Sequence, residues 1–208
     1  ISHLDLVRTM HKVIVRSKLP LWYTEGFNPK PKMVFAAPLS IGAESVCEFM
    51  DVRLTKKLPP KEVIEILNKN MTEEMQVLEA YYPTEKFTEL SWLTYEMKIK
   101  SEMDSTVLAE KCNEIFAKSE IFVLKKTKSG EQNVDIKPLI RSAIARAEGE
   151  LTVLDLVLSA DQSKFLNPEY IADVLRENLG ILTEKTLATE YYTILRTSAH
   201  KADMTEFR

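Results

Sequence analysis

Residues 58–71 read LPPKEVIEILNKNM and residues 166–179 read LNPEYIADVLRENL, and these two segments decide our prediction of the fold. They align at a constant offset of 108, and their apolar residues recur with the spacing of a helix that buries one face. Each has a proline near its start, where the missing N–H group costs little. The pair therefore predicts two equivalent amphipathic helices and an internal duplication.

Similar strand patterns flank the two helices. Residues 51–55 (DVRLT) precede the first helix and resemble residues 155–159 (DLVLS), which precede the second. The strand-like segments that follow, 77–82 and 189–197, each contain a glutamate ahead of a Tyr-Tyr pair. We therefore expect an α+β protein of tandem ferredoxin-like halves, in which each half has the order βαββαβ and an antiparallel sheet.

The predicted halves are residues 1–88 and 89–208. The N-terminal half lacks its opening strand, which we place upstream of residue 1. Its other expected strands, besides the one at 77–82, are residues 21–24, 33–37 and 47–54. In the C-terminal half we expect strands at 93–100 and 121–126 around a helix at 106–117, a turn at Ser129-Gly130, and strands at 134–140, 143–146 and 151–159.

The chain opens with a helix pattern. Ser2 can serve as the N-cap with Asp5 as its reciprocal partner, and Ile1 and Leu6 stand at the positions of a hydrophobic staple. Pro20 ends the pattern. The residues expected on the buried face are Leu6, Val7, Met10, Val13 and Ile14, whereas Arg8, Lys12 and Arg16 line up elsewhere on the helix.

Composition excludes several classes of function. Two cysteines cannot supply the ligands of an iron–sulfur cluster, and the three histidines lack zinc-site spacing, so we expect no metal and no cofactor. The five glycines form no phosphate-cradling loop and no nucleophile elbow, and we assign no catalytic residue. No apolar run approaches the roughly 20 residues that span a bilayer. We expect a cytoplasmic protein without a membrane role.

Positive charge is concentrated at the start of the chain. Residues 1–32 hold six lysines and arginines against two acids, a local charge of +4, whereas the whole chain carries −3. Cations beside aromatic residues and a proline-rich loop are typical of a site that holds a base or a phosphate. The candidate substrate-binding residues are His3, Asp5, Arg8, Arg16, Tyr23, Phe27, Asn28, Lys30 and Lys32. We expect the N-terminal end of the helix to approach residues 27–32 and to form one anion-binding surface with them.

These N-terminal residues also resemble a known family. The stretches ISHLDL (residues 1–6), EGFNPKP (residues 25–31) and APL (residues 37–39), with DIKPLI at residues 135–140, resemble the radical SAM-linked protein family. That family is a bacterial domain of unknown function, found beside or fused behind a cobalamin-binding radical SAM protein. The resemblance implies a radical SAM protein as partner, and it implies no catalytic residue.

Three functional interpretations remain open at this point. In the first, the chain is a non-catalytic accessory domain that binds RNA or a nucleotide-bearing substrate for a radical SAM enzyme. In the second, it is an RNA-processing endoribonuclease in which His3 acts as general acid or base, because tandem ferredoxin-like folds resemble the CRISPR repeat-processing nucleases. The region after Gly180 lacks the glycine-rich loop of those nucleases. In the third, the chain is a protein-interaction module that uses exposed sheet edges.

Overall fold

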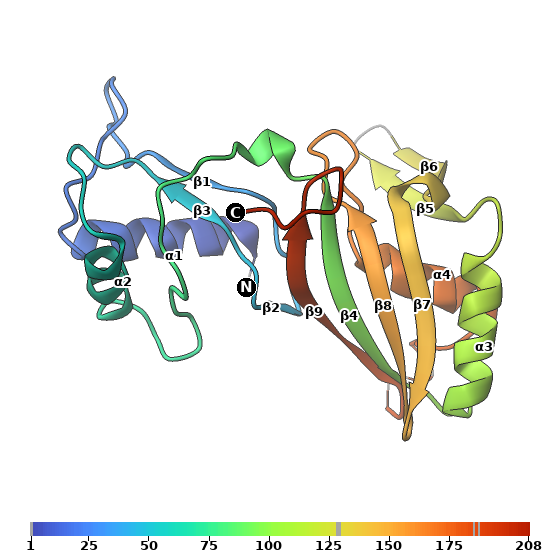
Figure 1. Cartoon of the computed structure of the whole chain (residues 1–208). Coiled ribbons are helices and arrows are strands. Elements are labelled where there is room, and N and C mark those ends of the chain that lie inside the picture. The colour runs from blue at the N-terminus through green and yellow to red at the C-terminus, as the bar shows by residue number, and fades with distance from the viewer. Residues whose placement is uncertain (1, 128–129, 185, 187) are drawn as a thin grey trace. The chain divides into compact units, whose positions relative to one another are not determined.

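The structure of the chain is a computed structural model, and it describes residues 2–127, 130–184, 186 and 188–208 (Figure 1). The staple predicted at Ile1 and the turn predicted at Ser129 lie outside these residues. The chain groups into two compact units. Unit 1 consists of residues 1–41, 48–86 and 208, and unit 2 consists of residues 42–47 and 87–207. No helix in the described part of the chain is long and apolar enough to cross a membrane.

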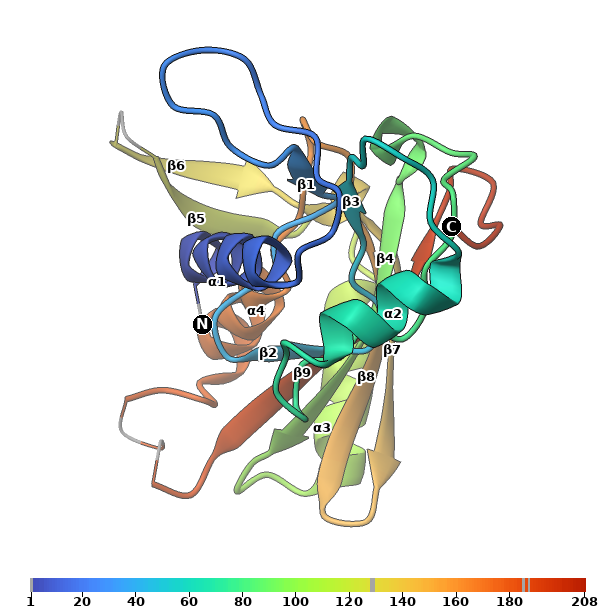
Figure 2. The ribbon, with the colours of Figure 1, turned by 90° about the vertical axis from the view of Figure 1, so that its left-hand side faces the viewer.

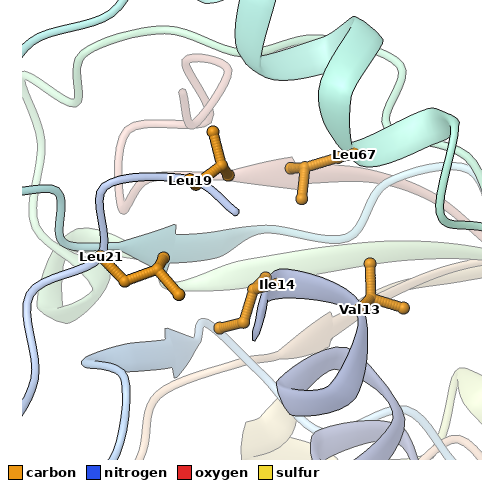
Figure 3. Close-up of a cluster of buried hydrophobic side chains, with 5 residues drawn as sticks. All are labelled: Val13, Ile14, Leu19, Leu21 and Leu67. Atoms are coloured by element: carbon orange, nitrogen blue, oxygen red, sulfur yellow. The ribbon is translucent and has the colours of Figure 1, made fainter. Parts of the chain in front are cut away.

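Unit 1 contains two helices and a short antiparallel sheet. Its elements are α1 (His3–Arg16), β1 (Met33–Phe35), β3 (Met50–Val52) and α2 (Pro60–Asn68). β1 and β3 pair so that Met33 faces Val52. The core of the unit is a cluster of five buried side chains, Val13 and Ile14 from α1, Leu19 and Leu21 from the segment after it, and Leu67 from α2 (Figure 3). Each such aliphatic side chain stabilises the unit by about 1.5–3 kcal/mol through burial.

The ends of α1 follow from its sequence. The Ser2 hydroxyl accepts a hydrogen bond from the Asp5 amide, which confirms the predicted N-cap, and the Asp5 carboxylate accepts from that same hydroxyl. At the other end the chain turns at Lys18, which has a positive φ of 58°. Met10, Val13 and Ile14 are buried as predicted, while Arg8, Lys12 and Arg16 are exposed.

Unit 2 is built on a five-stranded sheet with the order β2-β9-β4-β8-β7. Its strands are β2 (Ala43–Ser45), β4 (Trp92–Lys100), β5 (Phe122–Thr127), β6 (Gly130–Asp135), β7 (Ile140–Glu148), β8 (Leu151–Ser159) and β9 (Tyr191–His200). Its helices are α3 (Ser105–Phe116) and α4 (Glu169–Leu179), with single 3₁₀ turns at Phe87–Glu89 and Lys137–Leu139. The pair β5–β6 forms a separate hairpin between α3 and β7.

The main sheet of unit 2 has the connections of a ferredoxin-like fold. Apart from the hairpin β5–β6, the order β4–α3–β7–β8–α4–β9 is βαββαβ, and each helix joins two strands that have one other strand between them. All pairs among these four strands are antiparallel. The fifth strand, β2, comes from ahead of them in the chain and pairs with β9 in parallel, with Glu44 opposite Leu195.

Unit 1 does not have this arrangement, so the predicted duplication is not confirmed. In the described residues of unit 1 the sheet has two strands. The expected strand at 21–24 gives only isolated bridges at Leu21 and Tyr23, and the strand expected at 47–54 spans residues 50–52. Residues 77–82 form no strand.

Side chains hold the backbone where the strand at 77–82 was expected. The Asn68 side chain pairs with both backbone groups of Val77, at 2.8 and 3.0 Å. The Tyr82 hydroxyl likewise pairs with both backbone groups of Leu58, at 2.8 and 3.0 Å. The backbone groups of Val77, at the start of this segment, therefore need no neighbouring strand, and the Tyr82 side chain ties its end to Leu58. The two predicted equivalent helices share one contact near their C-terminal ends: the side chains of Asn70 and Asn178 each donate to the carbonyl four residues earlier.

Candidate functional site

The helix α1 spreads its predicted site residues along its whole length. His3 and Asp5 lie in its first turn, Arg8 in its middle and Arg16 in its last turn. At about 1.5 Å per residue, His3 and Arg16 are about 20 Å apart along the axis. A shallow hollow near the C-terminal end is lined by His11, Lys12, Val15 and Arg16. The cations of α1 therefore do not gather in one place: Arg8 lies in its middle and Arg16 in its last turn.

The N-terminal end of α1 already holds a carboxylate. The hydrogen bond from the Ser2 hydroxyl, followed by the interactions with Arg8, holds the pKa of the exposed Asp5 side chain below its usual value. Arg8 Nη1 lies 3.2 Å from Asp5 Oδ1, so its charge is partly compensated. An ionised Asp5 beside the positive end of the helix dipole occupies the place where an external anion would bind. This end of α1 is poorly suited to the phosphate that the sequence led us to expect there.

His3 packs against a ring instead of facing a substrate. Its imidazole makes an edge-to-face contact with Phe35 on β1, with the ring centroids 5.7 Å apart. Its Nδ1 atom is buried and has no hydrogen-bond partner among the described residues. A general acid or base needs a proton path at hydrogen-bond distance. The position of His3 therefore gives no support to the endoribonuclease interpretation.

The other predicted residues lie on one loop between α1 and β1, which we call the projecting loop (residues 22–32). It extends away from the body of unit 1 in both views of the ribbon (Figures 1 and 2). Backbone hydrogen bonds close its base, from Lys32 N to Trp22 O at 3.0 Å and from Thr24 N to Lys30 O at 2.9 Å. The Lys30 amide also donates to the Thr24 hydroxyl at 3.1 Å. The loop therefore has a fixed base and a short tip.

The tip of the projecting loop presents an aromatic ring to solvent. Phe27 is completely exposed, with a relative accessibility of 111%, and Tyr23 at the base is 43% exposed. The neighbouring Gly26 has a φ of +119°, a conformation that glycine adopts readily and that turns the chain at the tip. Asn28, Lys30 and Lys32 are also exposed, whereas Pro31 is buried and anchors the returning strand. The loop thus groups five of the nine predicted residues.

A cation that the sequence did not indicate completes the base of the projecting loop. The guanidinium of Arg53 lies 4.5 Å from the centroid of the Trp22 ring. Its backbone is fixed on both sides, because Trp22 N donates to Arg53 O and Arg53 N donates to Lys32 O. No local pattern marks Arg53, since its partner Trp22 stands 31 positions earlier.

The structure does not bring the N-terminal end of α1 to the projecting loop. His3 contacts Phe35 at the far end of β1, whereas Met33, at the start of β1, packs against the hydrophobic cluster to which α1 contributes Val13 and Ile14. Since the loop runs directly into Met33, it leaves unit 1 beside the C-terminal end of α1 (Figure 1). This geometry gives no support to one surface made from residues 2–5 and 27–32. Arg16 is the predicted helix residue at the end nearest the loop.

The electrostatics of the loop favour an anionic ligand. Among the described residues, no carboxylate makes an ion pair with Arg16, Lys30 or Lys32. Glu25 is the one acidic residue of the loop sequence. The projecting loop and the last turn of α1 therefore present cations that no described carboxylate pairs with, and the loop also presents aromatic faces.

In unit 2 one histidine contacts two hydroxyl groups, an arrangement that the sequence did not indicate. His200 Nε2 lies 2.8 Å from Ser198 Oγ and 3.1 Å from Thr94 Oγ1, on adjacent strands β9 and β4. Its Nδ1 is buried without a hydrogen-bond partner, so no carboxylate in the described residues orients the ring as a Ser-His-Asp triad requires. Nor do these residues contain a group of three histidines, cysteines or acids that could hold a metal ion.

Comparison with known families places the chain. Residues 1–168 match the family described as an uncharacterized protein conserved in bacteria (DUF2344), and the chain belongs to this family. The match includes α1, the projecting loop and most of unit 2 up to the start of α4. None of the curated proteins compared with the chain matches it.

Proposed function

We propose that this chain is a non-catalytic accessory domain of a radical SAM enzyme, and that it binds RNA or another phosphate-bearing substrate through the projecting loop. One observation carries the proposal. The loop holds the fully exposed ring of Phe27 on a hydrogen-bonded base, and Lys30 and Lys32 on the same loop make no ion pair with any described carboxylate.

Charge complementarity supports an anion as the ligand. Lys30 and Lys32 stand on the returning strand of the loop, with Arg53 at its base and Arg16 at the adjacent end of α1. Two prolines, at positions 29 and 31, and the Thr24 contacts limit the conformations of the loop before binding. A ligand that docks on a pre-formed loop loses less free energy to ordering.

The radical SAM partner rests on the resemblance of the N-terminal motifs. The GFNP tip of the projecting loop, residues 26–29, belongs to the stretch that carries this resemblance, as do His3 and Asp5. A radical SAM protein of the same bacterium, co-expressed with the tagged chain, is expected to co-elute with it. Absence of the protein from the eluate under anaerobic, low-salt conditions would count against the partner and leave the ligand proposal standing.

The ligand proposal is tested by fluorescence-anisotropy titration of RNA at several salt concentrations. Each phosphate contact on a single strand contributes about 0.7 to the slope of log K against log salt. The variant K30A/K32A should therefore bind more weakly and reduce that slope by about 1.4. The matched control, K61A/K69A, removes the same charge from two exposed positions, one in the first turn of α2 and one at its C-cap. The helix α2 lies away from the loop in both views (Figures 1 and 2).

The possible results separate the interpretations. Equal weakening by both double variants would mean a non-specific charge effect and contradict a site on the loop. If neither RNA nor a free nucleotide binds at low salt while the radical SAM protein co-elutes, the interaction-module interpretation replaces ours. RNA that is shortened during the titration would show the endoribonuclease activity.

A further inference from the structure

We infer that the projecting loop recognises an unpaired nucleotide, whose base stacks on the ring of Phe27. This inference rests on the proposed function and narrows its substrate class from phosphate-bearing ligands to single-stranded RNA. It depends on the presentation of one side chain, whereas the proposed function depends on the lysines.

The Phe27 ring is the most exposed large apolar side chain among the described residues of unit 1. Its 111% accessibility exceeds that of the next most exposed large apolar residues of unit 1, Leu78 at 75% and Ile41 at 70%. A phenylalanine left in water forgoes about 1.5–3 kcal/mol that burial would provide. The flanking Gly26 turns the chain and adds no side chain, and at 111% accessibility the Phe27 ring is open to a planar ligand.

The Phe27 ring is surrounded in sequence by polar and charged residues of the projecting loop. Apart from Gly26 and the two prolines, the residues around it in the loop are polar or charged: Glu25, Asn28, Lys30 and Lys32. The core of a protein–protein contact is a larger apolar patch that is depleted of charge. A single aromatic face, an amide that can pair with a base edge, and lysines within the same loop match the parts of one nucleotide instead.

Stacking on the Phe27 ring requires a base whose face is open, which favours a single strand over a duplex. In a duplex the faces of the bases are covered by their neighbours, and lysines contact mainly the phosphates. In single-stranded RNA the base faces are open, and stacking on an aromatic residue contributes to affinity without strong sequence preference. The ring would add nothing to the binding of a duplex, whereas it would contribute directly to the binding of a single strand.

The test compares F27A with wild type on fluorescein-labelled oligo(U) and oligo(A), on the duplex that they form together, and on free UMP and AMP as competitors. Loss of one stacked base should weaken single-strand binding about 5- to 100-fold and leave the salt slope unchanged, because the lost group carries no charge. Binding of the duplex should not change. The control L78A removes another exposed apolar side chain of unit 1 and should bind as wild type does.

The variant F27W keeps the stacking face and supplies a second readout. It should retain the affinity of wild type, and its added indole fluorescence should be quenched as the single strand binds. If K30A/K32A weakens binding while F27A binds the single strand as wild type does, the stacking inference is wrong and the proposed function stands. If neither RNA nor a free nucleotide binds wild type at low salt, both fall together, whereas a free nucleotide that binds without any RNA overturns the stacking inference alone. If free UMP displaces oligo(U) at an equal concentration, the loop binds a free nucleotide, and single-stranded RNA is not its specific ligand.

Discussion

The side chain of Asn113 on α3 pairs with both backbone groups of Ala145, in the middle of strand β7. Asn113 Oδ1 accepts from Ala145 N at 2.8 Å, and Asn113 Nδ2 donates to Ala145 O at 2.9 Å. β7 is an edge strand of the sheet of unit 2. The amide therefore takes the place that the backbone of another strand could occupy.

The variant N113A should destabilise the protein and open this edge. Two backbone groups of Ala145 would lose their partners, and an unsatisfied buried group costs about 1–3 kcal/mol. Urea denaturation should show this loss, and light scattering should show self-association that grows with concentration. N133A, on the exposed hairpin strand β6, is the matched control and should change neither measurement. An N113A protein with unchanged stability would show that the amide contact is incidental.

Glu190 ties two loops of unit 2 together. Its carboxylate accepts from the Ser101 hydroxyl and the Glu102 amide on one side, and from the Leu182 amide on the other, at 2.5–3.2 Å. Burial by itself raises the pKa of Glu190, but the hydrogen bonds from Thr186, Ser101 and the two amides outweigh it, so that the pKa lies below its usual value.

A lowered pKa makes the stability of unit 2 depend on pH through Glu190. The contribution of the ionised carboxylate is fully present above the ordinary glutamate pKa and is lost as the pH falls through the lowered value. E190Q should therefore be less stable than wild type at pH 7, by about 1–3 kcal/mol, and the difference should shrink in acid. Chemical denaturation at a series of pH values measures it. A difference that grows as the pH falls would contradict this assignment.

Cys112 should resist modification in the folded protein. It is completely buried on α3, and burial raises the pKa of its thiol to about 12. Since the thiolate is the reactive form, iodoacetamide at pH 8 should leave Cys112 intact until the chain unfolds. Peptide mapping before and after addition of urea gives the two rates, and the half-buried Cys47 is the internal comparison. Labelling of Cys112 in native buffer at the rate seen in urea would show that α3 opens readily.

Thr24 should control the affinity of the projecting loop. T24V keeps the shape of the side chain and removes the hydroxyl that accepts from the Lys30 amide. One such hydrogen bond contributes about 0.5–1.5 kcal/mol, so RNA affinity should fall about 2- to 10-fold through the looser loop, with no change in the salt slope. T24S retains the hydroxyl and should bind as wild type does. Equal loss in both variants would point to the methyl group.

The order of elements in residues 89–208 could be read from the sequence because its signals are local. Along β4, every second residue is buried between half-exposed neighbours, as a period of two predicts. The N-cap at Ser2 and the buried face of α1 formed by Met10, Val13 and Ile14 could be predicted for the same reason. Each of these signals lies within one element and needs no knowledge of its neighbours.

The rest depended on contacts that the sequence does not mark. An amphipathic helix such as α2 shows that one face is buried but not what covers it, so its likeness to α4 did not require a matching sheet. The three residues of β2 are too few to show a period. Of the expected site, the loop residues lie together, but the partner of His3 is Phe35, across 32 positions of chain. No local signal in the sequence showed which part of unit 1 the N-terminal end of α1 would approach.

The strand β2 makes the two units inseparable as pieces of a gene. The chain enters unit 2 at residue 42, returns to unit 1 at residue 48 and crosses again at residue 87. A recombination event at residue 87 would transfer β4 to β9 without β2 and leave the edge of β9, from Ile194 to Arg196, without its partner strand. Neither unit could be exchanged whole at a single join, so a fusion or a swap that preserves the sheet must carry both units together.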